Sequence, residues 1–234
     1  MVLEACLFSH RLSLIRTVID CLYNITAILQ DPAPNGTLFR KSGYQKALQG
    51  LDEDQKRYGG RREWDAWIAE QRSGIDDGLR DSGFKMADIT SQKWQWPTLG
   101  KYALDKLPGG VTTPHQDFLK SFTYGIWREY SAMLHGAFDG LMPTAGYYVQ
   151  DAMPHADRPK IDETFERDLF VHIGRAAGVL LCIVTEVHTY FKFDDNGARI
   201  NERIHEMWNA LIPVPEIKEL YDGHYEELMK ARGI

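Results

Sequence analysis

The spacing of apolar residues constrains this chain more than any other feature, because it fits α-helices and not strands. Three long stretches, residues 3–30, 115–139 and 161–193, repeat apolar side chains at helical intervals. The two-residue alternation of a half-buried strand is sustained nowhere in the 234 residues. We therefore expect an all-α protein, an irregular helical bundle built on three long helices.

The first of these stretches, residues 3–30, is apolar over most of its circumference. At 100° per residue its apolar arc covers about 200°, which is wider than a surface helix needs. The remaining stripe is polar and includes Ser9, Ser13, Arg16, Thr17, Asp20 and Asn24. The pattern predicts a central helix whose polar stripe faces a partner or a cleft. Pro32 and the pair Asn35-Gly36 predict that this helix ends in a turn.

The rest of the chain predicts shorter helices and one irregular region. The further helices are expected over residues 37–58, 61–80, 198–211 and 216–231. Residues 81–114, rich in Pro, Gly and Trp, read as a loop-rich insertion. Small residues between Gly174 and Gly178 predict that another helix crosses there closely. The length suits one domain over residues 1–234, because single cores stop growing only at roughly 250–300 residues.

Composition and charge limit the class of partner. The hydrophobic fraction of 44% and charged fraction of 26% are typical of a globular protein. A net charge of −6 argues against extended wrapping of nucleic acid, which needs many phosphate contacts. One short segment is basic and contains Lys56, Arg57, Arg61 and Arg62. We interpret it as a solvated helix end, with a small local RNA site as the alternative.

Cysteine usage and hydropathy predict a cytoplasmic protein. Cys6 and Cys21 lie on one predicted helix about 22 Å apart, too far for a disulfide. Cys182 sits in an apolar run and is expected in the core. The N-terminus lacks the pattern of a signal peptide, and no apolar run approaches the ~20 residues that span a bilayer. We expect no membrane contact. Nucleotide-binding loops and metal-ligand sets are missing from the sequence, so neither a cofactor nor a metal is expected.

Arg16 and Asp20 are the first candidate site. Their i, i+4 spacing places both on one face of the first helix. A charged pair on a mostly apolar helix must be solvated, paired or both. Two interpretations stay open: a buried salt bridge that fixes packing, and a polar cleft in which Arg16 binds an anionic group.

Arg128 and His135 are the second candidate site. Seven residues are nearly two helical turns, so the two side chains differ by about 20° and share a face. Tyr124 and Ser131 flank them. A guanidinium that stabilises phosphate charge, beside an imidazole that transfers a proton, is the minimum equipment for cleaving RNA without a metal. A surface arginine beside an interior, hydrogen-bonded histidine is the alternative interpretation.

Two patterns resemble known helical families. Arg128-x6-His135 is similar to the Arg-x4–6-His motif of the HEPN superfamily, which occurs in toxin–antitoxin and phage-defence systems. Arg16-x3-Asp20, followed by Tyr130-Ser131-x3-His135, resembles an uncharacterised bacterial helical family with Arg-x3-Glu and Ser-x3-His. The resemblance covers residues 5–30 and 118–190. Asp20 replaces the usual Glu, and acidic Glu129 stands where HEPN nucleases carry a neutral polar residue.

The resemblance implies a metal-independent endoribonuclease that works as a homodimer, with the motifs of two protomers forming one cleft. His135 would act as acid or base, and Arg128 or Arg16 would stabilise the developing charge. Asp20, Tyr124, Tyr130 and Ser131 would support these residues. The alternative is a non-catalytic helical module that binds a partner protein or a small anionic ligand through the polar stripe of the first helix.

Overall fold

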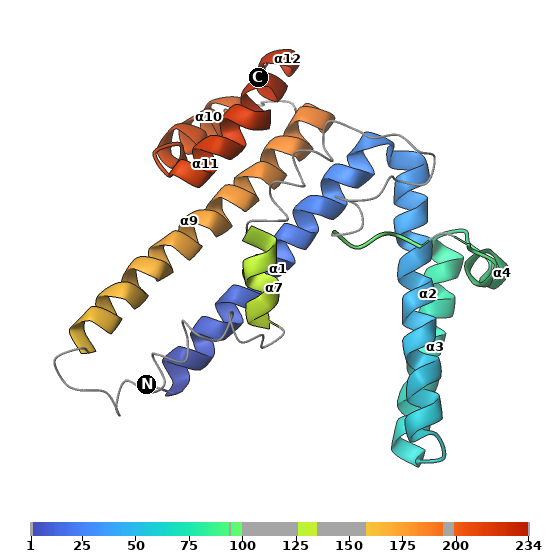
Figure 1. Ribbon diagram of the computed structural model, residues 1–234. Coiled ribbons are helices and arrows are strands. Elements are labelled where there is room, and N and C mark those ends of the chain that lie inside the picture. Colours follow the sequence, from blue (N-terminus) through green and yellow to red (C-terminus); the bar gives the residue numbers. More distant parts are fainter. Residues whose placement is uncertain (1, 94, 100–125, 135–157, 194–198, 234) are drawn as a thin grey trace. The chain divides into compact units, whose positions relative to one another are not determined.

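The computed structural model describes residues 2–93, 95–99, 126–134, 158–193 and 199–233, and every regular element among them is a helix (Figure 1). The all-α class predicted from the sequence is confirmed. The helices are α1 (Val2–Gln30), α2 (Pro32–Tyr58), α3 (Arg62–Asp81), α4 (Met86–Thr90), α7 (Arg128–Leu134), α9 (Arg158–Phe191), α10 (Ile200–Leu211), α11 (Pro215–Leu220), the π-helix η3 (Tyr221–Tyr225) and α12 (Glu226–Arg232).

The first and third predicted long helices correspond to α1 and α9. Of the second, expected over 115–139, only residues 126–134 are described, and α7 lies within them. Helices α2 and α3 have 27 and 20 residues, so a bundle built on three long helices is not confirmed. The chain divides into two compact units, residues 1–26 with 99–234, and residues 27–98. The single domain that the length suggests stays a prediction.

The turn expected after the first helix is instead the start of α2. Pro32 occupies the first turn of α2, where a proline removes no hydrogen bond that the helix needs. The Asn35 side-chain amide donates a 2.8 Å hydrogen bond to the Ala27 carbonyl, which lies in the last turn of α1. Asn35 and Gly36 therefore belong to α2, and the Asn35 side chain links α2 to the end of α1. The prediction of a turn at these residues is wrong.

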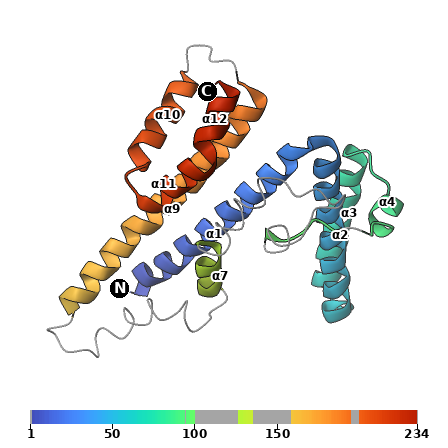
Figure 2. The same cartoon turned by 45° about the horizontal axis from the view of Figure 1, so that its top comes forward.

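In the unit formed by residues 27–98, α2 and α3 lie side by side as an antiparallel hairpin (Figures 1 and 2). The Tyr44 hydroxyl lies 3.1 Å from Ser82 Oγ. A Cβ at Gly78 would stand 2.8 Å from the same hydroxyl, so any larger residue there would displace the Tyr44 side chain. Ser42 Oγ accepts a 2.7 Å hydrogen bond from the Trp96 backbone N–H, which fixes the segment after α4.

In the other unit, α10 and α11 pack against the second half of α9. Gly178 confirms the close crossing predicted from the small residues: a Cβ there would meet the Ile217 side chain of α11 at 3.1 Å. Trp208 of α10 is 1% exposed, and its indole N–H donates a 3.1 Å hydrogen bond to Thr185 Oγ1 of α9. Burying a side chain of this size contributes several kcal/mol to the free energy of folding.

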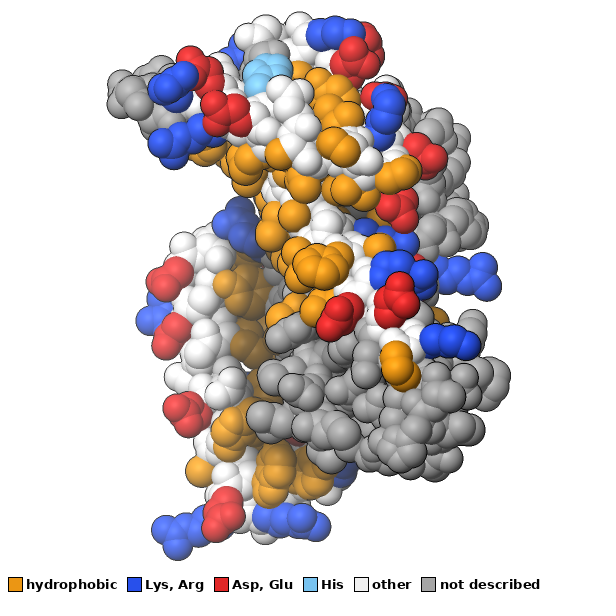
Figure 3. Space-filling view, turned by 90° about the vertical axis from the view of Figure 1, so that its left-hand side faces the viewer, with side chains coloured by type: hydrophobic (Ala, Val, Ile, Leu, Met, Phe, Trp, Pro, Cys, Tyr) orange, Lys and Arg blue, Asp and Glu red, His pale blue; other side chains and the backbone are white. Residues whose placement is uncertain are grey.

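Another face of α9 is apolar and exposed. Figure 3, which looks onto the left-hand side of Figure 1, shows hydrophobic side chains gathered there. By length and composition alone, the segment Glu166–Phe191 would suffice to cross a membrane, and it is the only such segment in the described part of the chain. Core helices of soluble proteins meet the same criterion, and only 39% of its most apolar window is buried.

Candidate functional site

Of the residues singled out from the sequence, Arg16 and Asp20 lie on α1, and Arg128, Tyr130 and Ser131 lie on α7. Trp127, which immediately precedes α7, contacts the first two. Its indole N–H donates a 3.1 Å hydrogen bond to Asp20 Oδ1. The Arg16 guanidinium lies 5.3 Å from the centre of the indole ring, within the range of a cation–π interaction. Arg16 Nη2 is 3.9 Å from Asp20 Oδ2, so the two residues also form an ion pair within α1. Trp127 therefore lies against the charged part of the polar stripe.

The Arg16–Asp20 pair is neither fully buried nor open. Their side chains are 23% and 37% exposed, and 3.9 Å is long for an ion pair. Exposed pairs contribute ~0–1 kcal/mol, whereas a hydrogen bond to a charged group contributes about 1.5–3 kcal/mol. The hydrogen bond from Trp127 is thus the strongest contact that Asp20 makes.

This hierarchy predicts the behaviour of two substitutions at Asp20. Asp20→Ala should lower the free energy of unfolding by about 1–2 kcal/mol, because it removes the acceptor of the Trp127 hydrogen bond. Asp20→Asn keeps a carbonyl oxygen for that bond and removes only the charge, so it should lose less than half as much. Chemical denaturation monitored by circular dichroism measures both. If the two variants are equally destabilised, the ion pair and not the Trp127 hydrogen bond dominates.

Glu129 and Tyr130 of α7 contact residues of α9. The Tyr130 hydroxyl lies 2.7 Å from His172 Nδ1. Arg175 Nη1 donates a 2.9 Å hydrogen bond to Glu129 Oε2, and Arg175 Nη2 donates one of 3.3 Å to Glu216 Oε1 of α11. Arg175 is 15% exposed, so these ion pairs are only partly screened by water. The α7 helix is therefore held by α1 through Trp127 and by α9 through Glu129 and Tyr130.

Burial fixes the protonation states of Tyr130 and His172. It raises the pKa of Tyr130 to about 12, against the lowering effect of a hydrogen bond from Arg175. Burial also lowers the pKa of His172, although the charge of Glu129 opposes this. Both groups are therefore neutral at pH 7. The 2.7 Å contact between the Tyr130 hydroxyl and His172 Nδ1 is therefore a hydrogen bond between two neutral groups, and the tautomer of His172 decides which of them donates.

The structure places the described site residues in different environments. Arg16 and Asp20 contact Trp127, whereas Tyr130 is fully buried against His172. Arg128 is exposed and makes no ion pair within the described part of the chain. Ser131 is half-buried on the same helix. His135 and Tyr124 lie outside the described residues.

Four residues of this region were not singled out from the sequence: Trp127, His172, Arg175 and Glu216. The sequence does carry one signal for two of them. His172 and Arg175 are three apart and flank Gly174 in the stretch of small residues where a close helix crossing was predicted. Polar side chains at a close crossing must find partners there, because a buried polar group without one is costly.

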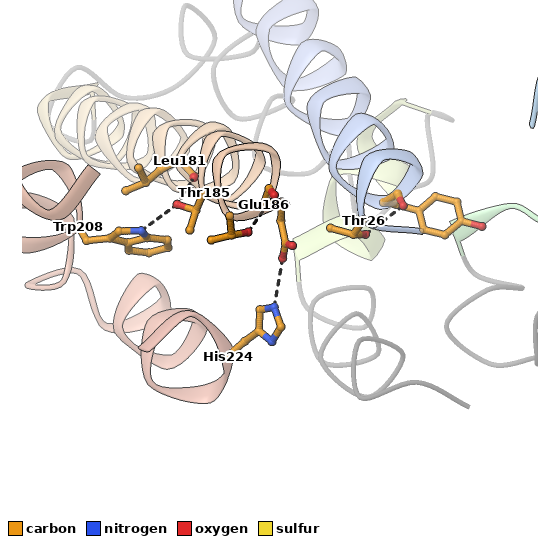
Figure 4. A network of polar contacts seen from close by, with 8 residues as sticks. Thr26, Leu181, Thr185, Glu186, Trp208 and His224 are labelled. Atoms are coloured by element: carbon orange, nitrogen blue, oxygen red, sulfur yellow. Dashed lines mark hydrogen bonds and ion pairs between the residues drawn. The ribbon is translucent and has the colours of Figure 1, made fainter. Parts of the chain in front are cut away.

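A second polar cluster lies between α9, α10 and η3 (Figure 4). Glu186 Oε1 is 3.1 Å from His224 Nε2, and Thr185 bonds both Trp208 and the Leu181 carbonyl. The side chains of Glu186 and His224 are 6% and 15% exposed, so a polymeric substrate could not reach them. We assign this cluster to holding the C-terminal helices on α9.

Cys182 belongs to the same region and is fully buried, which confirms its predicted place in the core. Burial raises the pKa of its thiol well above the ordinary value, so it stays protonated and unreactive. Among the residues that the structure describes, no three His, Cys, Asp or Glu side chains gather as metal ligands. The chain matches none of the protein families, curated proteins or solved structures with which it was compared.

Proposed function

We propose that the chain is an HEPN-like, metal-independent endoribonuclease. The observation that supports this most is the state of Arg128, which is exposed and free of ion pairs with described residues, on a helix held by both α1 and α9. An arginine held in this way can bind a phosphate without first breaking another contact. A cytoplasmic role as a toxin or phage-defence component belongs to the same proposal and follows from the sequence resemblance.

The proposed reaction needs only groups of the chain and the RNA. The ribose 2′-hydroxyl loses its proton and attacks the adjacent phosphorus, which forms the O2′–P bond and breaks the P–O5′ bond. His135 transfers the proton between the two oxygens, as general base or general acid. Arg128 stabilises the negative charge that develops on the phosphate oxygens.

Arg128 is a better candidate for this role than Arg16. The Arg16 guanidinium lies on the Trp127 ring and beside Asp20, so a phosphate would compete with a carboxylate for it. Arg128 has no such competitor among the described residues, and it shares a helix face with His135 by spacing. Cleavage of single-stranded RNA by the purified chain in EDTA tests the proposal. Absence of cleavage across pH 6–9 would contradict it.

The homodimer is a second part of the proposal, and the exposed face of α9 supports it. Seven apolar residues on this face are spaced alternately by three and four: Phe170, Ile173, Ala177, Leu180, Val184, Val187 and Phe191. We call them the α9 seam. Five of its side chains are between 44% and 73% exposed. Spacing of this kind is the pattern by which two helices pack as a coiled coil, here over about 30 Å.

The opposite face of α9 carries charged residues, which favours a protein partner over a membrane for the seam. Arg175 and Glu186 lie there, and both are bonded to other helices of the chain. Charged side chains in a membrane-spanning helix are costly. We propose that the seam packs on the seam of a second copy, which would bring two copies of α7 into one particle.

Leu180→Glu should convert the dimer to a monomer. The substitution places a charge in the middle of the seam of each protomer, and burying an unpaired charge costs several kcal/mol, which corresponds to a Kd raised by about 100-fold or more. Analytical ultracentrifugation over a range of concentrations measures the Kd.

Val171→Glu is the matched control for this substitution. Val171 is 38% exposed on the same helix and points about 150° away from the centre of the seam. This variant should remain dimeric. A parent chain that is monomeric at every concentration, or a Leu180→Glu variant that dimerises like the parent, would remove the seam as the dimer interface.

A further inference from the structure

We infer that the turn between α2 and α3 is a binding platform for single-stranded RNA. The inference rests on the proposed function only for the choice of RNA as the ligand. It concerns the unit formed by residues 27–98, so it does not depend on how the two units are arranged. In Figures 1 and 2 this turn forms the end of the hairpin that extends beyond α4.

The turn has a defined backbone geometry. Both carboxylate oxygens of Asp65 lie 3.2 Å from the Gly60 backbone N–H, and the Gln55 side-chain amide donates a 3.3 Å hydrogen bond to Oδ1. Gly60 has a φ of +85°, and a Cβ at Gly59 would clash with the Gln55 carbonyl oxygen. The two glycines and Asp65 therefore hold the ends of α2 and α3 in one arrangement.

Three aromatic rings gather beside this turn. Tyr58 and Trp64 are stacked, with ring centres 4.3 Å apart and planes 17° apart. Trp67 meets Trp64 edge to face at 5.8 Å. Trp64 and Trp67 are 37% and 41% exposed, although their rings are among the most apolar surfaces a protein can bury. Exposed, preorganised rings of this kind are what unpaired bases stack on.

Two guanidinium groups lie beside one of these rings, that of Tyr58. The guanidinium groups of Arg57 and Arg61 each lie 5.9 Å from the centre of the Tyr58 ring. Lys56 and Arg62 flank them in the sequence, and none of the four cations makes an ion pair with a described residue. A guanidinium beside an aromatic ring can bind a phosphate while the neighbouring base stacks.

The nearby acidic residues indicate which form of nucleic acid fits. Glu53, Asp54 and Glu63 lie close in the sequence, and Asp65 is engaged in the turn, so residues 53–65 carry no net charge. Long-range electrostatic attraction to a duplex is therefore weak. In a duplex the base faces are also covered by the neighbouring base pairs, so they cannot stack on the tryptophans. Stacking supplemented by a few phosphate contacts favours a single strand. A protein partner is the competing ligand for exposed tryptophans.

Binding of a fluorescein-labelled 2′-O-methyl oligouridylate to the full chain, measured by fluorescence anisotropy, tests the inference. The probe should be about twelve nucleotides long, within the range that single-strand platforms cover. Because it lacks the 2′-hydroxyl, it cannot be cleaved by the proposed reaction, so binding is measured independently of nuclease activity. We expect saturable binding that a duplex of the same length does not match.

Trp64→Ala should weaken binding about tenfold or more, which is the usual effect of removing one stacking partner. Arg57→Gln combined with Arg61→Gln should weaken binding more in low salt than in high salt. The matched control is Arg40→Gln: Arg40 lies on α2 against an aromatic ring, 5.2 Å from the centre of Phe84, but far along the helix from the turn. It should bind like the parent.

Trp67→Ala provides a second test if Trp64→Ala lowers the helical circular dichroism signal. Failure of the parent chain to bind the probe would overturn the inference, and so would unchanged binding by both tryptophan variants. Either result would leave the tryptophans to a protein partner. Neither would affect the nuclease proposal, which is tested by cleavage.

Discussion

Arg128→Ala should lower the rate of RNA cleavage by a factor of about 10²–10³, the usual cost of removing one group that stabilises transition-state charge. Arg16→Ala should lower it far less, since Arg16 is engaged with Asp20 and Trp127. His135→Ala should cost a factor of about 10²–10⁴, because it removes the proposed proton-transfer group. Single-turnover cleavage of a labelled RNA measures all three rates.

Arg167→Ala is the matched control for these arginine substitutions. Arg167 lies on α9 with a side chain that is 72% exposed, and its partner is the neighbouring Asp168 at 3.5 Å. The control variant should cut RNA like the parent. Because Arg128 is exposed, its alanine variant should keep the parental circular dichroism spectrum. An Arg128→Ala variant with parental activity would remove this residue from the site, and greater loss in Arg16→Ala would transfer the role to α1.

The second large effect is expected at Tyr130, and it concerns stability. Tyr130→Ala should lower the free energy of unfolding by about 3–5 kcal/mol, because it leaves a cavity where a fully buried ring had been. Tyr130→Phe keeps the ring and should cost about 1–3 kcal/mol, because His172 and Arg175 lose their shared partner. Chemical denaturation separates the contribution of the hydroxyl from that of the ring. Equal stability of Tyr130→Phe and the parent would show that the hydroxyl contributes nothing.

The same contact predicts a dependence on pH. The folded chain lowers the pKa of His172, so below about pH 6.5 the unfolded chain binds a proton that the folded chain does not. Stability from this residue is therefore fully present above that pH and is lost as the pH falls further. The parent should lose more stability between pH 7 and pH 5 than His172→Gln does. Parallel losses in the two proteins would show that His172 is not held neutral.

The sequence predicts helices far better than it predicts their contacts. The bounds of α1 and α9 follow from long runs of apolar residues at helical spacing, and the close crossing at Gly178 follows from missing side-chain bulk. The join between α1 and α2 was mispredicted, because proline and asparagine are used in the first turn of a helix as well as in loops. Local patterns of this kind leave such alternatives open.

The candidate site shows the same limit. The spacing of Arg128 and His135 can be read from the sequence, but the exposure of Arg128 cannot. Trp127 bonds Asp20 across 107 positions of sequence, and Tyr130 bonds His172 across 42. These contacts depend on how α7 lies against α1 and α9, which no local pattern encodes. They also distinguish Arg16, which is paired, from Arg128, which is not paired with any described residue.

The chemistry of the RNA ends tests the central proposal most directly. Purified chain should be incubated with a defined single-stranded RNA in excess EDTA, and the fragments analysed by mass spectrometry. Attack by the 2′-hydroxyl predicts 2′,3′-cyclic phosphate on one fragment and a free 5′-hydroxyl on the other, with neither product formed by His135→Ala. Fragments with 5′-phosphate ends, or cleavage that stops in EDTA, would contradict the proposal that this helical protein cuts RNA without a metal.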